Sequence, residues 1–364
     1  MGLLARRLSM HDWRNFSGKE LSFGEALTVL VGRNAMGKTN AVEALQLLTA
    51  GYSFRRPRPA QLVREGAQTG RAMLELEGDG RVIDLELEAT CDPPRRHWRR
   101  NGKACAPQDL PQTLMSVLFC PDDLSFVKRG ATFRRDEIDD FGRQAASGYS
   151  RLLQAYSRTV DQRNRLLKEP YPDLALLDAW DSSLALGGSA LIVARERLFE
   201  RLSRRVVEVY GQIAGGEALD CSYESSLGID LAGLTRDEVC DAFLARLAKV
   251  RGDELRRQQT LVGPQRDDLV FRVDGRDARS FASQGQQRTI VLAWKMAEVD
   301  LAREVVGQLP LLLLDDVMSE LDAQRRSAMT RFVEDGMQTV VTTTNLGYFP
   351  DELLADAEVV QIGA

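Results

Sequence analysis

Eight consecutive residues have the types and spacing of a phosphate-binding loop. They fit the pattern G-x-x-x-x-G-K-[ST], in which backbone N–H groups surround the phosphates of a nucleotide and the lysine reaches the terminal ones. Chance agreement with the pattern is the alternative. We call residues 32–39 the phosphate loop, and its members are Gly32, Arg33, Asn34, Ala35, Met36, Gly37, Lys38 and Thr39.

Two adjacent carboxylates follow one of the longest apolar runs in the sequence. Residues 311–314 are all leucine and lead into Asp315 and Asp316, which predicts a buried strand with acids at its C-terminal end. Sheets of α/β proteins place ligand chemistry at that end of their strands. Thr39 and Asp315 are candidates to bind the Mg²⁺ of a nucleoside triphosphate, Asp315 directly or through water. Asp316 is a candidate to orient or deprotonate the attacking water, or only to support its neighbour.

The segments on both sides of the phosphate loop have the patterns that such a loop needs. Residues 27–31 are a short apolar run with β-branched members, which is typical of a buried strand. Residues 40–48 are good helix formers with apolar side chains on one face. Free N–H groups and the positive end of the helix dipole would both point at the loop. The sequence therefore predicts nucleotide binding.

Ser283 and Gln286 precede an apolar helix that is predicted from Ile290 onward. Ser283 has the type and position of a helix N-cap, and Gln286 lies at N3, so a capping box alone explains both residues. The alternative is a second anion-binding helix start. That site cannot serve the same nucleotide if it lies far across the sheet.

The remaining patterns predict a mixed sheet structure interrupted by helices. Residues 3–31 predict two strands leading into the phosphate loop, and further strands are predicted at 117–119 and 338–344. Alternation at 72–77 and 83–88, and the Asn-Gly turn within 98–103, predict two hairpins of an antiparallel side sheet.

Residues 149–206 have helical periodicity, interrupted by Pro170 and Pro172. This pattern predicts a helical hairpin with limbs of about 25–35 residues, which would span roughly 40–50 Å. Two antiparallel helices can bury an apolar seam against each other, so no third partner is needed at the tip. Residues 236–259 predict a further, charged helix.

Bulk composition limits the classes of partner. The 364 residues are 44% hydrophobic, and a net charge of −5 gives no overall attraction to nucleic acid. DNA contact would depend on the basic patches at 55–58 and 95–103, for which solvated charged loops are the alternative. The five dispersed cysteines argue against structural zinc and suit a reducing compartment. We see no apolar run near the ~18–20 residues of a membrane span and no signal peptide, and we expect a cytoplasmic protein without membrane contact.

Two short segments resemble those of ABC-type ATPases. Residues 282–286, A-S-Q-G-Q, are similar to the L-S-G-G-Q signature of that family, and residues 319–322 are similar to its D-loop. In that family the signature caps the γ-phosphate of the nucleotide held by the other subunit. Within the ABC-type ATPases the chain resembles the SMC-like RecF family of bacterial recombination mediators along nearly all its length. The matching segments are 32–40 with 43–44, 52–55, 119–124, 134–135, 262–269, 281–289 and 313–322.

The resemblance implies the fold class and the site. The fold would be α/β, an ABC-ATPase head (a P-loop mixed sheet with an antiparallel β side sheet) plus an inserted short helical-hairpin arm. Residues 1–144 and 260–364 would form the head, lobe I, and residues 145–259 the arm, lobe II. Lys38 and Asp316 would be catalytic, and Thr39 and Asp315 would bind Mg²⁺. The candidate ATP-binding residues are those of the phosphate loop with Arg14, Asn40, Ser283, Gln286 and Asp322.

The sequence departs from the family pattern at a few positions. Gln265 replaces the histidine of a segment that usually reads G-P-H-R-D-D, and Thr132-Phe133 stand where a proline commonly precedes the paired arginines. No histidine follows the 340–344 strand, and no Q-loop glutamine is assigned. These departures do not affect the expectation of ATP binding, but they leave the water-positioning residues unassigned.

The resemblance implies an ATP-dependent DNA-binding protein of recombinational repair. An ATP-dependent homodimer would close on duplex DNA and gap junctions near single-strand gaps, and weak, DNA-dependent ATP hydrolysis would release it. With RecO- and RecR-like partners it would support recombinase loading, replication restart and SOS induction. The alternative is a P-loop phosphotransferase acting on a small molecule, which would leave the signature-like segment and the helical arm without a role.

Overall fold

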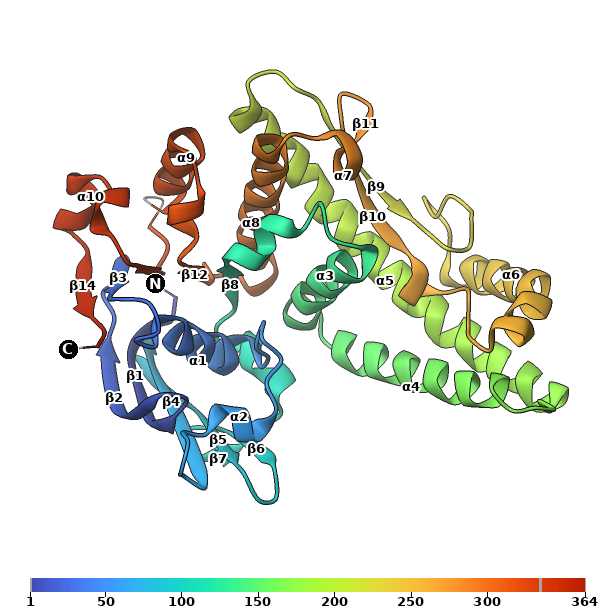
Figure 1. The fold of residues 1–364 in the computed structure, drawn as a ribbon, viewed down its shortest axis with the longest axis horizontal. Coiled ribbons are helices and arrows are strands. Elements are labelled where there is room, and N and C mark those ends of the chain that lie inside the picture. The colour runs from blue at the N-terminus through green and yellow to red at the C-terminus, as the bar shows by residue number, and fades with distance from the viewer. Residues whose placement is uncertain (1, 334–335, 364) are drawn as a thin grey trace. The chain divides into compact units, whose positions relative to one another are not determined.

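The computed structural model describes residues 2–333 and 336–363 (Figure 1). Contacts within the chain define two compact units, Met1–Leu124 with Val291–Ala364 and Ser125–Ile290. These bounds differ from those of the predicted head and arm, and the predicted division into lobes stays a prediction.

The first unit contains a five-stranded sheet whose neighbouring strands are all parallel, in the order β14-β3-β13-β12-β8. Parallel strands covered on both faces read as continuous apolar runs, which is why 27–31 and 311–314 were recognisable in the sequence. The predicted strands at 27–31, 117–119, 311–314 and 338–344 are confirmed. The strands are β3 Leu27–Val31, β8 Ser116–Phe119, β12 Leu311–Asp315, β13 Thr339–Thr343 and β14 Glu358–Gln361.

A six-stranded antiparallel sheet completes the strands of this unit, in the order β2-β1-β4-β5-β6-β7. Both predicted hairpins are confirmed, and the second turns at Asn101 and Gly102, which have positive φ. The prediction of two strands in residues 3–31 is wrong, because a tight turn between Trp13 and Phe16 divides the segment and gives three. The strands are β1 Leu4–Trp13, β2 Phe16–Ser22, β4 Thr69–Gly78, β5 Arg81–Thr90, β6 Arg95–Arg100 and β7 Lys103–Ala104.

Helix α1 (Lys38–Ala50) is the centre of the first unit. It contacts β4 and β5 of the antiparallel sheet and β8, β12 and β13 of the parallel sheet, and its apolar residues belong to one core with those of both sheets. This packing fixes the helix that follows the phosphate loop on both sides. The shorter helices of the unit are α2 Pro59–Leu62, α9 Ala323–Val333 and α10 Asp351–Ala355, and α8 Gln284–Val306 begins in the second unit and ends in the first.

The second unit contains the predicted helical hairpin, α4 (Tyr149–Leu167) and α5 (Leu174–Ala214). Its limbs have 19 and 41 residues, so the prediction of about 25–35 residues is wrong for both limbs. The prediction that no third partner is needed at the tip is also wrong. Leu255 of α6 (Arg236–Arg257) packs against the cluster of Leu166, Leu167 and Leu177, because a two-helix seam leaves these side chains uncovered on one side. The other elements are α3 Ala131–Ala145, α7 Ala278–Phe281, β9 Leu219–Glu224, β10 Asp268–Val273 and β11 Arg276–Asp277.

Helix α5 is the one helix among residues 2–333 and 336–363 that is long and apolar enough to cross a membrane by length and composition alone. Its buried face packs against α4, α6 and β9, and 44% of its most apolar 18-residue stretch is buried. These contacts are those of the core helix of a globular unit.

Candidate nucleotide site

The glycines of the phosphate loop occupy positions that admit no side chain. A Cβ atom on Gly32 would lie 2.4 Å from the carbonyl oxygen of Ile362, which follows the neighbouring strand β14. Gly37 has a φ of 104°, and its Cβ would lie 2.4 Å from the ring of Phe16. The close approach of backbone and the left-handed conformation therefore both require glycine. This accounts for the two fixed glycines of the pattern.

The side chain of Lys38 reaches back to the first residues of the phosphate loop. Its Nζ donates hydrogen bonds to the carbonyl oxygens of Gly32 (2.7 Å) and Arg33 (3.2 Å), and the residue is buried. Helix α1 begins at Lys38, so the N–H groups of its first turn lack helical partners and face the loop. Residues 33–36 are exposed. The arrangement places the free N–H donors of a helix start beside a buried cation.

Thr39 and Asp315, the two candidate Mg²⁺ ligands, contact each other. The Thr39 hydroxyl donates to Asp315 Oδ1 over 3.1 Å, and the Thr342 hydroxyl donates to the same oxygen over 2.8 Å. Burial raises the pKa of Asp315, while the hydrogen bonds from Thr342 and Thr39 act in the opposite direction. The pair is therefore a hydroxyl and a poorly solvated carboxylate, which are oxygen ligands of the kind that Mg²⁺ prefers.

Asp316 has an unusual backbone and a free carboxylate oxygen. Its φ is 54°, in the left-handed region that is uncommon for a residue with a side chain. Its backbone N–H donates to the Thr342 hydroxyl over 2.9 Å, which holds this conformation. Its Oδ1 is buried and accepts no hydrogen bond from residues 2–333 and 336–363. A buried acceptor of this kind is costly unless it has a partner, so Asp316 is suited to binding something beyond the chain itself.

Sequence reasoning missed the residue that anchors Arg14. Glu43 is fully buried in α1 and accepts hydrogen bonds from Arg14 Nε (2.8 Å) and NH2 (2.7 Å), and from the Ser53 hydroxyl (2.7 Å). Arg55 NH1 lies 3.7 Å from the same carboxylate and donates to Asn40 Oδ1 over 2.8 Å. The structure thus brings Arg14 and Arg55 to α1, where they contact Glu43 and, through Arg55, Asn40. The available signal was an acidic residue within the apolar run of α1.

Ser283 and Gln286 form the capping box that the sequence allowed. Gln286 N–H donates to Ser283 Oγ over 3.2 Å, and Ser283 N–H donates to Gln286 Oε1 over 2.8 Å. Helix α8 begins at Gln284, directly after the N-cap position that the sequence assigned to Ser283, and the apolar part expected from Ile290 follows its first turns. These residues belong to the second unit and the phosphate loop to the first. A nucleotide role for them stays a prediction.

Asp322 also acts as a helix cap. Its Oδ1 accepts a hydrogen bond from Arg325 N–H over 3.0 Å at the start of α9, and its carboxylate pairs with the Arg325 side chain. Capping alone therefore explains its side chain, and its predicted nucleotide contact is not tested by this geometry.

Two segments of the second unit that resemble the RecF family, residues 134–135 and 262–269, are joined by hydrogen bonds. Arg134 Nε and NH2 donate to the two oxygens of Asp268 over 2.8 and 2.7 Å, and Arg135 NH1 donates to the Asp267 carbonyl over 2.6 Å. Gln265, which departs from the family pattern, accepts a hydrogen bond from the Tyr156 hydroxyl. The paired arginines and the paired aspartates therefore join α3 to β10.

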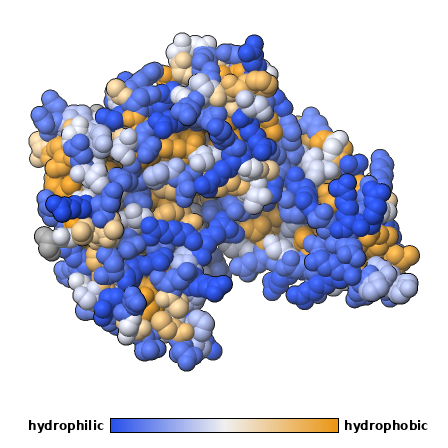
Figure 2. Space-filling view, in the orientation of Figure 1, coloured by the Kyte–Doolittle hydropathy of each residue, from blue (hydrophilic) through white to orange (hydrophobic). Residues whose placement is uncertain are grey.

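Several arginine side chains of the basic hairpin at 95–103 are bonded to other residues of the chain. Arg96 donates to the Pro57 carbonyl, Arg99 pairs with Glu86 at 3.3 Å, and Arg100 donates to the Thr113 hydroxyl at 3.2 Å. Figure 2 shows a mainly hydrophilic face on which apolar residues gather in separate areas. DNA contact by this hairpin stays a prediction.

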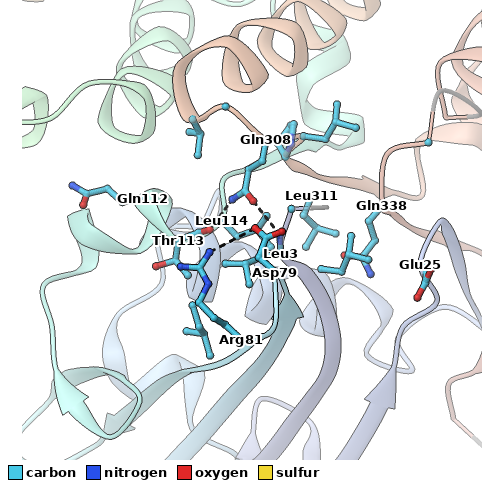
Figure 3. Close-up of a pocket in the computed structure, with 18 of the residues that line it drawn as sticks. Leu3, Glu25, Asp79, Arg81, Gln112, Thr113, Leu114, Gln308, Leu311 and Gln338 are labelled. Carbon is cyan, nitrogen blue, oxygen red and sulfur yellow. Dashed lines mark hydrogen bonds and ion pairs between the residues drawn. The ribbon is translucent and has the colours of Figure 1, made fainter.

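A cavity of the first unit, about 910 Å³, lies at the wrong end of the parallel sheet for the predicted chemistry. It is lined by Ala26, Leu311 and Gln338, which stand at the amino ends of their strands, whereas the phosphate loop follows the carboxyl end of β3. Figure 3 shows Gln308 and Gln338 beside it, but their amides bind backbone groups of the chain. The cavity is therefore separate from the candidate nucleotide site.

Comparisons with known proteins agree on one family. The family model described as RecF/RecN/SMC N terminal domain matches residues 4–352. A protein of Synechocystis sp. named "DNA replication and repair protein RecF" is 37% identical, and the match covers 99% of this chain and 96% of that protein.

Two solved structures give the fold. One, described as "Structure of the recombination mediator protein RecF-ATPrS in RecFOR pathway", has a TM-score of 0.90 at 28% identity and covers 100% of this chain and 96% of its own. The other, an SmcHead bound to the C-winged helix domain of ScpA, has a TM-score of 0.55 at 16% identity, covers 98% of this chain and 93% of its own, and supports the fold alone. The predicted class, an ABC-ATPase head with a side sheet, is confirmed. The chain belongs to the RecF/RecN/SMC N-terminal domain family and, within it, to the RecF proteins.

Proposed function

We propose that this chain is an ATP-dependent DNA-binding protein of recombinational repair. ATP-driven homodimerisation on duplex DNA near single-strand gaps, followed by slow hydrolysis and release, would support recombinase loading, replication restart and SOS induction in the cytoplasm. The names of its relatives, which include replication, repair and recombination mediation, support this role. Partners similar to RecO and RecR are expected because the RecF relative acts in a RecFOR pathway.

The observation that carries the proposal is the contact between Thr39 and Asp315. A loop that admits only glycine at two positions is joined to an acidic strand end by a 3.1 Å hydrogen bond. Hydroxyl and carboxylate oxygens fit Mg²⁺, which keeps several waters and phosphate oxygens as its other ligands. Thr39 and Asp315 would hold the ion, which would supply positive charge to neutralise the phosphates. Lys38 and the first N–H groups of α1 supply the remaining positive field.

Hydrolysis is assigned to Asp316. Its buried Oδ1 has no hydrogen-bond donor within the described residues, so it is placed to accept a proton from a water molecule. A general base of this type must lie within hydrogen-bond reach of the proton that it removes. Glu320, in the 3-10 turn that follows Asp316, is the alternative carboxylate.

The cap on the γ-phosphate is assigned to a second copy of the chain. Ser283 and Gln286 begin the 23-residue helix α8 with an intact capping box, and they belong to a different unit from the phosphate loop. A helix start of this kind favours an anion. The site would then be complete only in the dimer, which makes ATP the trigger of association.

The test is association measured by analytical ultracentrifugation with ATP, without ATP, and with the Lys38→Ala and Ser283→Arg variants. We expect an ATP-dependent dimer of the native chain that both variants lose. Arg288→Lys is the matched control, because it lies one turn further along α8 and keeps the charge. If Ser283→Arg dimerised at the same ATP concentrations as the native chain, a nucleotide site shared between two copies would be ruled out.

DNA binding is measured in parallel on duplex, gapped and single-stranded DNA. We expect ATP to increase affinity for duplex and gap junctions, and Lys38→Ala to abolish the increase. Binding that ignores both nucleotide and Lys38 would contradict the mechanism. Turnover by a monomer that releases a phosphorylated small molecule would favour the phosphotransferase alternative.

A further inference from the structure

The side-chain amide of Gln286 is held at both ends within its own subunit. Its oxygen accepts the Ser283 N–H (2.8 Å), and its nitrogen donates to Glu217 Oε1 (2.8 Å). Capping explains the first bond but not the second. Glu217 lies outside every segment that carried the sequence resemblance, so the contact is visible only in the fold.

Glu217 is itself anchored. Its other oxygen, Oε2, accepts a hydrogen bond from the Tyr210 hydroxyl over 2.8 Å, and Tyr210 is fully buried near the end of α5. The chain turns between them at Gly215 and Gly216, whose φ values of 68° and 119° suit glycine. A buried tyrosine thus fixes one oxygen of the carboxylate and leaves the other for Gln286.

This arrangement decides which end of the amide is the donor end. An amide has two N–H hydrogens on one side and an acceptor oxygen on the other, and the two ends exchange when the group flips. A carboxylate accepts only, so Glu217 holds the nitrogen towards itself, and one amide hydrogen remains for a further acceptor. In the flipped state the amide oxygen would face an incoming phosphate and repel it.

We propose that Glu217 is a positioning residue that orients the Gln286 amide for the γ-phosphate of a second copy's nucleotide. The inference rests on the proposed function, because Gln286 acts there across the dimer. Glu217 works through its acceptor oxygen and not through its charge. Glu217 therefore affects dimerisation, and it does not affect nucleotide binding by the phosphate loop of the same chain.

The test compares Glu217→Ala with Glu217→Gln, which keeps an acceptor oxygen and can still bond to Tyr210. We expect Glu217→Ala to raise the protein concentration for half-maximal ATP-dependent dimerisation about tenfold, the size of one ordinary hydrogen bond. Glu217→Gln should dimerise at least as tightly as the native chain. Glu208→Ala, at an exposed carboxylate near the end of α5, the helix that precedes Glu217, is the control for the loss of a negative charge.

Two further measurements separate positioning from misfolding. Binding of a fluorescent ATP analogue to the monomer should be the same in all variants, and so should the far-UV circular dichroism. Native-like dimerisation by Glu217→Ala would overturn the proposal, as would equal weakening by Glu217→Gln.

The Gln286 side-chain amide resonance provides a readout that needs no dimer. Glu217→Ala should shift and broaden it in the nucleotide-free monomer, and Glu217→Gln should restore it. An unchanged resonance in Glu217→Ala overturns the positioning role, whether or not the native chain dimerises with ATP. A native chain that stays monomeric with ATP overturns the proposed function instead.

Discussion

Thr39 and Asp315 share a 3.1 Å hydrogen bond although 276 positions separate them. Thr342 donates to the same carboxylate oxygen from the neighbouring strand. One acidic side chain thus connects the end of the phosphate loop with two parallel strands of the first unit. Removing its charge tests the site without removing its hydrogen-bond acceptor.

Asp315→Asn should stabilise the nucleotide-free protein at pH 7 by about 0.5–2 kcal/mol. Burial raises the pKa of Asp315 above the ordinary 3.8, so the folded chain holds this proton more strongly than the unfolded chain. Stability therefore falls as pH rises from the unfolded-state pKa through the raised value. The neutral amide avoids that loss and keeps an oxygen for Thr39 and Thr342.

Urea unfolding at pH 7 and near pH 4 measures this effect. The gain should be smaller at the lower pH, which lies close to the ordinary pKa of 3.8, because the carboxyl is then protonated in most folded chains and in part of the unfolded ones. Asp161→Asn, at an exposed position on α4, should change little at either pH. A gain that is the same at both pH values would contradict the assigned cause.

Asp316→Asn should lower ATP hydrolysis by roughly 10²–10⁴-fold, the usual contribution of a general base. ATP-dependent dimerisation should persist, since phosphate binding is assigned to other residues. Steady-state phosphate release and ultracentrifugation report the two properties separately. Glu320→Gln is the matched control, and loss of hydrolysis in that variant alone would move the base to Glu320.

Glu43→Gln should cost about 3 kcal/mol of unfolding free energy, because it leaves the guanidinium of Arg14 without its buried counter-ion. Arg14 NH2 lies 2.7 Å from the Glu43 carboxylate, whose side chain is fully buried. Urea denaturation followed by circular dichroism measures the loss, with Glu65→Gln at an exposed position as the control. Equal stability of the two variants would show that Arg14 does not depend on this carboxylate.

Arg134→Lys should cost roughly 2 kcal/mol, since buried acceptors lose their donors. Arg134 binds both oxygens of Asp268 and the carbonyls of Val127 (3.0 Å) and Arg129 (2.6 Å). A lysine ammonium cannot reproduce this planar set of donors. Thermal unfolding measures the loss against Arg165→Lys, an exposed site on α4. Native stability of Arg134→Lys would mean that charge alone suffices there.

The sequence predicted those elements whose structure is determined by their own residues. Strand β12 is buried on both faces and is therefore an unbroken leucine run, and the turn at Asn101 and Gly102 carries its own conformational preference. The phosphate loop was recognisable for the same reason, because each fixed residue meets a requirement of the loop itself.

Tertiary partners decided what the sequence left open. Nothing near Glu43 in sequence shows that Arg14 and Ser53 will meet it, and nothing near Gln286 indicates Glu217. The tip of the helical hairpin was misjudged for a similar reason, because Leu255 arrives from a helix that is distant in sequence. Periodicity predicts that a face will be buried but not which element covers it.

The position of β3 has a consequence for synthesis of the protein. Its two neighbours in the sheet are β13 and β14, so among residues 2–333 and 336–363 the strand that leads into the phosphate loop pairs only with the segments Thr339–Thr343 and Glu358–Gln361. At 5–20 residues per second, a ribosome needs roughly 15–60 s to make the intervening ~300 residues. Through that interval the apolar β3 lacks its native pairing, and the phosphate loop lacks the Ile362 carbonyl that shapes it. A nascent chain is therefore unable to assemble this nucleotide site until translation of these strands is complete, which makes the period of synthesis the time when β3 most needs protection from aggregation.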